Sequence, residues 1–134
     1  GSEMCIRDRE YDTGSFNDMD FEFRNGGPIT EEEALAEAAA LGLHVEAFDS
    51  DRTEDTELHW HEFEVNVWLI SGEASYATAD GTVYEAKPGC RLKAPAGWVH
   101  QELICPTHRM VTGTNIPRAE WTEPVKKPVV ELSA

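Results

Sequence analysis

The sequence predicts one all-β domain, a barrel or a sandwich, with one short helix near its N-terminal end. From about residue 43 onward, short β-prone segments alternate with turns that contain Gly or Pro, such as ADG at 79–81 and KPG at 87–89. A series of short strands with this punctuation and no helices between them is typical of β-sandwiches and barrels. The 134 residues suffice for one domain with a core of that size.

The one helix that we expect lies in the segment TEEEALAEAAALG at 30–42. Thr30 and Glu33 have the spacing of a capping box, in which each side chain accepts a hydrogen bond from a free N–H group at the start of the helix. The acidic residues 31–33 favour the positive end of the helix dipole, and Gly42 suits the position after the helix end. The alanines between them suit close packing on a sheet.

The remaining elements are expected to be strands in a domain that spans residues 29–118. Before this domain, residues 1–28 form a polar arm in which FEFR at 21–24 is a candidate edge strand. After it, residues 119–134 form a tail that runs extended over the surface, because prolines interrupt it. The expected strands lie near residues 43–49, 58–70, 73–79, 82–86, 90–94, 99–104 and 109–115.

The first residues carry little information about the origin of the chain. GSE at 1–3 resembles a cloning scar, and MCIRDR at 4–9 resembles a translated sequencing adaptor of the kind met in metagenomic reading frames. The absence of a visible signal peptide therefore does not decide between a cytoplasmic and a secreted bacterial protein.

Charge and cysteine content exclude several classes of function. The 26 acidic and 11 basic residues give a formal net charge of −15, which repels nucleic-acid phosphates and anionic lipids. We therefore expect no nucleic-acid or membrane partner, and a neutral small molecule or carbohydrate as the ligand.

Cys5, Cys90 and Cys105 are odd in number and have no CxxC spacing, which argues against a disulfide framework. Cys90 is expected to be a buried, inert thiol.

Three histidines form the candidate metal site. His59 and His61, in the segment HWH, are two residues apart, so on a strand both side chains lie on the same face. That face continues with Phe63, Val65, Val67 and Leu69 and therefore points into the core. A third imidazole, His100, follows the turn PAG at 95–97, and a barrel brings such distant segments together.

At these residues the chain resembles a small single-domain cupin. HWHEFEVNVWLISG at 59–72 follows the first cupin motif at its two histidines and at Gly72. GCRLKAPAGWVH at 89–100 follows the second motif without a gap through Gly89, Pro95, Gly97 and His100. The resemblance implies an all-β double-stranded β-helix, that is, a jelly-roll barrel with one N-terminal helix, and a metal ion held by His59, His61 and His100.

The chain also departs from the cupin pattern. Val65 stands where the first motif has its glutamate ligand, Ile104 where the second has asparagine, and Thr53 where the first begins with glycine. Glu64 is one residue away from the ligand position and faces outward, unless a bulge turns it inward. Glu102 faces the same way as His100, which makes it a candidate for proton transfer or for an additional ligand.

Three imidazoles without a carboxylate favour Cu or Fe over Mn, with Ni and Zn as further candidates. The resemblance then implies a cupin oxidoreductase that uses O2 or peroxide on a neutral organic substrate, such as cellulose or a phenolic. We assign Glu102 the catalytic proton transfer, and Trp60 and Trp98 are candidates for stacking on a substrate ring. Two alternatives stay open: a non-catalytic cupin that binds a small molecule or sugar, and a metal-dependent lyase or isomerase with a Tyr or Glu base.

The remaining expectations concern the surface. His44 and His108 lie outside both motifs and are expected to be ordinary surface histidines. Trp68 and Ile70 lie on the outer face of their strand, where they are candidates for a subunit interface. Small cupins commonly pair through β-strands, so we expect a homodimer.

Overall fold

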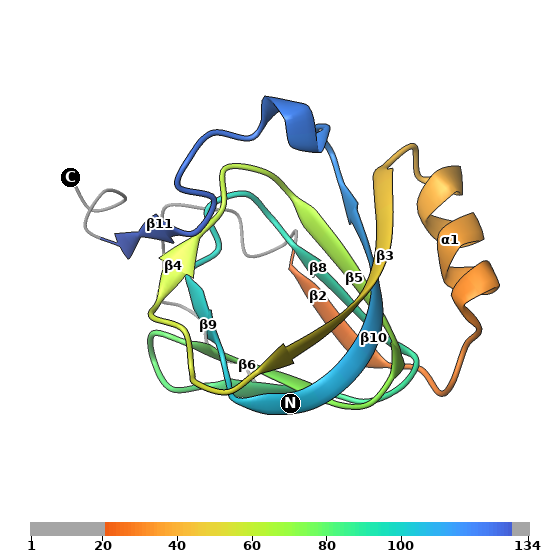
Figure 1. Ribbon diagram of the computed structural model, residues 1–134, viewed down its shortest axis with the longest axis horizontal. Coiled ribbons are helices and arrows are strands. Elements are labelled where there is room, and N and C mark those ends of the chain that lie inside the picture. Colours follow the sequence, from red (N-terminus) through yellow and green to blue (C-terminus); the bar gives the residue numbers. More distant parts are fainter. Residues whose placement is uncertain (1–20, 130–134) are drawn as a thin grey trace.

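The computed structural model describes residues 21–129 as two antiparallel five-stranded sheets that face one another and enclose a core (Figure 1). One sheet has the order β2 (Glu22–Asn25), β8 (Cys90–Ala94), β5 (Val65–Ser71), β10 (Cys105–Thr114), β3 (His44–Arg52). The other has the order β11 (Lys127–Pro128), β4 (His59–Trp60), β9 (His100–Glu102), β6 (Ala74–Thr78), β7 (Val83–Ala86). The helix α1 (Glu31–Ala40) and the 3-10 helix η3 (Arg118–Glu120) lie outside the sheets. The predicted all-β fold with one helix is confirmed.

The core lies between the sheets, where alternate residues of the strands point inward. Val65, Val67 and Leu69 of β5 contribute to it from one face, as the alternation predicts. Asn66 and Trp68, between them, point to the opposite face of the sheet. The buried members of this core cluster are Leu69, Ala74, Tyr76, Ala86, Cys90, Leu92, Ala94 and Trp98. Cys90 is buried as expected, and burial raises the pKa of its thiol to about 11; that the thiol is inert stays a prediction.

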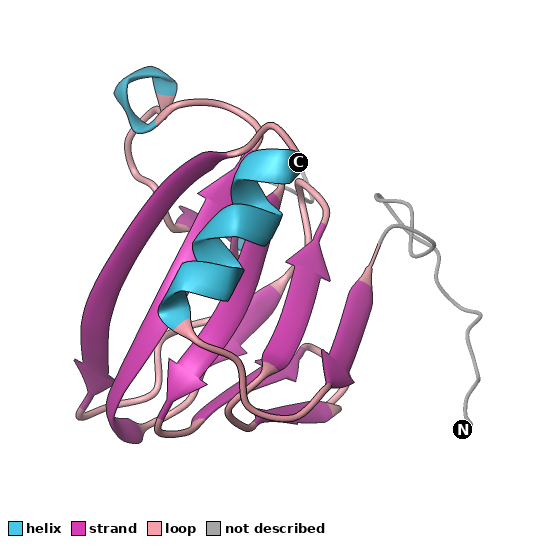
Figure 2. Cartoon of the chain, turned by 90° about the vertical axis from the view of Figure 1, so that its right-hand side faces the viewer, coloured by secondary structure: helices cyan, strands magenta, loops and turns pink. Residues whose placement is uncertain are grey.

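Helix α1 covers the outer face of the sheet that contains β5, β10 and β3 (Figure 2). Its start has the predicted capping box, because the Thr30 hydroxyl accepts from the Glu33 N–H and the Glu33 carboxylate accepts from the Thr30 N–H. Trp68 is buried beneath the helix, and its indole N–H donates to Glu37 over 2.9 Å. Ile70 packs against the same cluster. Both residues face outward as predicted, but the helix covers them, so they do not offer a free interface. Within residues 21–129, no helix is long and apolar enough to cross a membrane.

Two of the predicted strands have other boundaries in the structure. The segment 58–70 divides into β4 and β5, because residues 61–64 bond to neighbouring loops instead of continuing the ladder: the Gly97 N–H donates to the His61 carbonyl, and the Glu64 N–H donates to Asn115. The last strand, β10, begins at Cys105 and not near residue 109. His108 is therefore inside a strand and only 2% exposed, and the prediction of a surface position was wrong. His44 is exposed as expected.

The tail does more than run over the surface. After η3 the chain turns back, and β11 pairs antiparallel with β4, with Lys127 opposite Trp60 and Pro128 opposite His59. FEFR, by contrast, forms the predicted edge strand as β2. Residues 1–20 of the expected arm and 130–134 of the expected tail lie outside the described residues.

Gly89, the first residue of the second cupin-like motif, has to be glycine because the backbone of Gly27 passes very close to it. Its φ is +92°, and a Cβ built there would lie 1.6 Å from the carbonyl oxygen of Gly27. Gly81 has nearly the same φ, +91°, but a Cβ there would have nothing within 4 Å. Gly89→Ala therefore combines strain with a collision that only movement of the backbone at Gly27 relieves, whereas Gly81→Ala brings strain alone.

We expect Gly81→Ala to lower the free energy of unfolding by about 1 to 2 kcal/mol and Gly89→Ala by roughly 2 kcal/mol more. Urea denaturation of both variants beside the unmodified chain measures the difference. Equal losses in the two variants would show that the approach of Gly27 does not constrain residue 89.

Candidate metal centre

Three histidines and one glutamate meet inside the barrel. His59 lies on β4, His61 directly after it, and His100 and Glu102 on β9. Each offers one nitrogen or oxygen atom, and these four atoms lie within 4.8 Å of one another. Ligands of one ion with bonds near 2.1 Å are about 3 to 4 Å apart, so small side-chain rotations bring this set to that spacing. The structure thus brings together all three imidazoles that the sequence singled out.

The pairing of β4 with β9 places two of these rings. His59 is directly opposite His100 in the register of the two strands, and their ring centroids are 4.4 Å apart. His61 completes the group at 5.1 Å from His59 and 5.4 Å from His100. Because His59 and His100 are 3% and 4% exposed, the cluster lies within the protein.

A backbone carbonyl fixes the tautomer of each imidazole. The Nδ1 atom of His59 lies 2.7 Å from the Glu57 carbonyl, and that of His100 lies 3.0 Å from the Trp98 carbonyl. The Nδ1 atom of His61 lies 2.9 Å from the carbonyl of Val125. A carbonyl only accepts, so each Nδ1 carries the hydrogen and each neutral ring keeps its Nε2 lone pair free. Carbonyls bound to the second ring nitrogen are the usual partners of histidine metal ligands.

The chemistry of the donor atoms fits a cation. The Nε2 of His59 is buried and has no hydrogen-bond partner among the described residues, although buried polar atoms are rarely left unpaired. Around it are two further imidazoles and a carboxylate, all of which are donors that transition metals accept. A metal ion held by these residues would satisfy the unpaired nitrogen and offset the cost of burying the carboxylate.

Glu102 supplies the negative charge of the group. Its Oε2 atom lies 3.5 Å from the Nε2 of His59 and 3.7 Å from that of His100. Its Oε1 atom accepts from Arg52 at 2.6 and 2.9 Å. Burial opposes the charge of this carboxylate, but the Arg52 guanidinium that donates to its Oε1 favours the charge, and the pKa of Glu102 lies well below its usual range. Glu102 is therefore ionised and presents one oxygen to the imidazoles.

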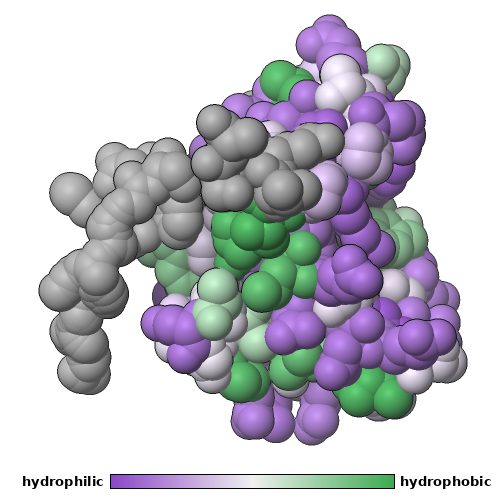
Figure 3. All heavy atoms as spheres, turned by 90° about the vertical axis from the view of Figure 1, so that its left-hand side faces the viewer, coloured by the Kyte–Doolittle hydropathy of each residue, from purple (hydrophilic) through white to green (hydrophobic). Residues whose placement is uncertain are grey.

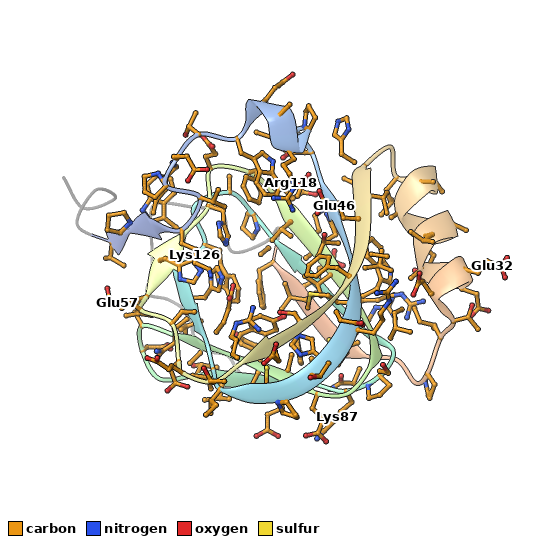
Figure 4. All side chains as sticks on the ribbon, viewed as in Figure 1. Glu32, Glu46, Glu57, Lys87, Arg118 and Lys126 are labelled. Carbon is orange, nitrogen blue, oxygen red and sulfur yellow. The ribbon has the colours of Figure 1, made fainter. Side chains whose placement is uncertain are left out.

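A second cation stands at the edge of the site. Lys126 lies on the β4 side of the molecule, where Glu57 is also found (Figure 4), and its Nζ is 4.0 Å from Glu102 Oε1. Its side chain is 54% exposed, which makes this a weak, solvent-screened contact. Lys126 thus marks the side on which the charged group comes nearest to solvent.

Aromatic rings hold two of the imidazoles. Trp98 stacks on His100 with centroids 4.4 Å apart and an angle of 14°, and it is only 6% exposed. His61 stacks on Phe63, which in turn stacks on Trp121. Trp98 therefore packs behind His100, a candidate ligand, and Trp60 donates its indole N–H to the Pro128 carbonyl. The substrate roles predicted for Trp60 and Trp98 stay predictions.

Several features of the site differ from the sequence-based expectation. Glu64 does not turn inward, because its carboxylate accepts from Asn66 outside the cluster. Glu102 offers the carboxylate that is missing at Val65. Mn was disfavoured because the predicted site had no carboxylate, so this reason no longer applies. Glu102 has two candidate roles, ligand and proton-transfer residue, and the second stays a prediction. Sequence reasoning missed Arg52 and the carbonyl of Val125, which no motif marks.

Comparison with known proteins supports the fold. No family model and no curated protein matches the sequence. A cupin 2 domain-containing protein from Halorhodospira halophila matches with a TM-score of 0.51 and 17% identity over 96% of this chain and 85% of that chain. A DUF861 family protein from Thermotoga maritima matches with a TM-score of 0.49 and 15% identity, over 69% of this chain and 96% of that one. The polyketide cyclase RemF from Streptomyces resistomycificus matches with a TM-score of 0.49 and 24% identity, over 62% and 58% respectively.

The chain has the jelly-roll fold of the cupins. The jelly roll predicted from the two motifs is confirmed, and the group of three histidines and one glutamate that could hold a metal ion fits a cupin-type function. At these identities the likeness concerns the fold, and it does not transfer the activity of any of these proteins.

Burial gives His61 a pH-dependent effect on stability. It lowers the pKa of His61 to about 4, against the opposing effect of the Val125 carbonyl, and the neighbouring His100 and His59 lower it further. In the unfolded chain the ordinary value is 6.5. Between these values the unfolded chain binds a proton that the folded chain does not, so stability is complete above pH 6.5 and falls as the pH drops towards 4.

We expect the metal-free protein to lose about 2 to 3 kcal/mol of unfolding free energy through His61 between pH 7 and pH 4.5. Urea denaturation at both pH values measures the total loss, and the His61→Gln variant, which lacks the titrating ring, isolates this share. If the variant loses as much as the unmodified chain, His61 is not the group responsible.

Proposed function

We propose that this cupin is a metal-dependent oxidoreductase in which His59, His61, His100 and Glu102 hold one copper or iron ion. The observation that carries the proposal is the convergence of four donor atoms within 4.8 Å, with every imidazole tautomer fixed by a carbonyl. Such a group, buried and preset, suits a resident ion better than a structural role, since unpaired buried imidazoles and carboxylates are costly.

When bound, copper or iron supplies electron transfer to O2 or peroxide. The chain's own residues do the rest. Four protein donors leave coordination positions on a six-coordinate ion for a substrate or oxidant. Arg52 pairs with the carboxylate of Glu102 and keeps it ionised, so this buried ion pair carries no net charge. Trp98 and Phe63 exclude water from one side of His100 and His61.

The proposed substrate is a neutral organic molecule, with a polysaccharide such as cellulose or a phenolic as specific versions. The net charge of −15 disfavours strongly anionic substrates. On the side where β4 and β11 lie, hydrophobic atoms gather near the middle of a mostly hydrophilic face (Figure 3). A partly apolar surface on this side of the barrel suits the ring of a sugar or a phenol.

A metal-dependent lyase or isomerase is the second candidate, because Tyr76 is buried beside Glu102. The two residues are opposite each other in the pairing of β6 with β9, and the Tyr76 ring lies 6.4 Å from that of His100. Burial, reinforced by the Glu102 charge, raises the pKa of Tyr76 well above its usual range, which keeps its hydroxyl protonated as a donor. Non-redox chemistry with such a donor needs no O2.

We also propose, on the resemblance to small cupins, that the chain forms a homodimer. Trp68 and Ile70 cannot form the interface while α1 covers them. A strand edge that the fold leaves open is therefore the proposed contact.

The metal site is tested by loading the protein with copper or iron and measuring the bound metal by mass spectrometry. We expect one ion per chain. His59→Ala and His100→Ala are expected to weaken binding by more than about 100-fold, because each removes a direct ligand. His44→Ala, at an exposed histidine outside the cluster, is the matched control and should bind as the unmodified chain does. Equal binding by all four proteins would place the metal elsewhere.

The reaction class is tested with the metal-loaded protein and candidate substrates in the presence and absence of O2 or peroxide. An oxidoreductase should convert substrate only with the oxidant, and with cellulose plus a reductant it should yield products with oxidised ends. Conversion that continues unchanged without oxidant would favour the lyase or isomerase. No conversion with metal bound would favour a binding protein.

A further inference from the structure

The segment 122–128, which we call the strap, folds back over the metal centre. Its end forms β11, which lies beside β4 (Figure 1), with Pro128 opposite His59. The Trp60 indole N–H donates to the Pro128 carbonyl over 3.1 Å and fastens the same end. The strap therefore lies against the strand that carries the first metal-ligand candidate.

The strap provides the partner of one imidazole only. His59 and His100 donate to carbonyls two residues earlier in the chain, those of Glu57 and Trp98. His61 donates instead to Val125, which is 64 residues away in sequence. The orientation of His61 thus depends on where the strap lies, whereas that of the other two rings is set locally.

One buried lysine determines the shape of the strap. Lys127 is 7% exposed, and its Nζ donates three hydrogen bonds: to the Thr122 carbonyl at 3.2 Å, to the Thr122 hydroxyl at 3.0 Å and to the Pro124 carbonyl at 2.9 Å. These bonds use all the donors of an ammonium group. Val125 lies in sequence between Pro124, whose carbonyl Lys127 holds, and Lys127 itself, so this lysine fixes the peptide that faces His61.

Glu62 connects the strap to the loop that carries His61. One carboxylate oxygen accepts from the Thr122 hydroxyl at 2.8 Å, and the other accepts from the Thr122 N–H. Thr122 therefore joins Lys127 to the residue that follows His61. The side chains of Lys127 and Glu62 do not belong to the donor group. Together they hold the Val125 carbonyl within hydrogen-bond distance of the His61 imidazole.

From these contacts we infer that Lys127 is a positioning residue of the metal centre, acting through the Val125 carbonyl to hold His61 with Nδ1 protonated and Nε2 free. The inference rests on the proposed metal site, which it deepens. A lysine that merely fastens the tail would affect stability without any specific effect on His61. The tautomer of His61 separates these two roles.

The test compares imidazole ¹⁵N NMR spectra of the metal-free unmodified chain, Lys127→Met and the control Lys87→Met at pH 8. Lys87 is exposed and bonds only weakly to Glu73, at 3.4 Å. In Lys127→Met we expect His61 to shift from the Nδ1–H form towards a mixture of tautomers, while His59 and His100 keep their signals as internal controls. If Lys127→Met does not fold, Glu62→Gln, which weakens the hold on Thr122, undergoes the same comparison. An unchanged His61 signal in the folded variant overturns the inference.

Zn²⁺ titration by calorimetry gives the second readout. Loss of an outer partner of a ligating histidine typically weakens metal binding by ~10- to 100-fold, and we expect this for Lys127→Met but not for Lys87→Met. Lys127→Arg, which keeps the charge and the donors, should recover part of the affinity. If the unmodified chain binds neither Zn²⁺, Cu²⁺ nor Fe²⁺, the proposed function fails, whereas equal Zn²⁺ affinity in the unmodified chain and Lys127→Met defeats the role of Lys127 alone.

Discussion

The pairing of β4 with β9 is the constraint on which the metal centre depends. It sets His59 directly opposite His100, with both rings turned into the barrel and their centroids 4.4 Å apart. Two imidazoles in such contact inside a protein are poor core residues, because each has a nitrogen that needs a partner. The Nε2 of His59 has no hydrogen-bond partner among the described residues, and a cation there would complete the arrangement.

Each surrounding element adds one contact to the group around this pair of histidines. The turn before β9 sends the Trp98 ring behind His100, and β3 brings the guanidinium of Arg52 to Glu102. The strap brings a carbonyl to His61. None of these contacts lies within the donor group, yet together they decide which atoms of the group face inward. A jelly roll suits such a site, because its sheets hold most of the candidate ligands on rigid strands. Loops and the tail then supply the carbonyl groups that bond to the imidazoles from outside the donor group.

The parts of the site that the sequence predicted are those governed by local rules. Alternation along β5 places Val65, Val67 and Leu69 on the core face, and the parity of Glu102 with His100 on β9 is visible in the same way. Contacts that depend on long-range register were not predictable. Arg52 reaches Glu102 only because β3 and β9 approach across the barrel, and Val125 reaches His61 only because the tail reverses. His108 was misplaced because its strand begins earlier than its composition indicates.

The central claim is that three imidazoles and a carboxylate from β4, β9 and the loop between β4 and β5 bind one ion. X-ray absorption spectroscopy of the copper- or iron-loaded protein tests it most directly. We expect a nearest shell of nitrogen and oxygen near 2.0–2.1 Å and multiple scattering from about three imidazole rings that falls by one ring in His61→Ala. A spectrum without imidazole scattering, or one unchanged by that substitution, would contradict the claim.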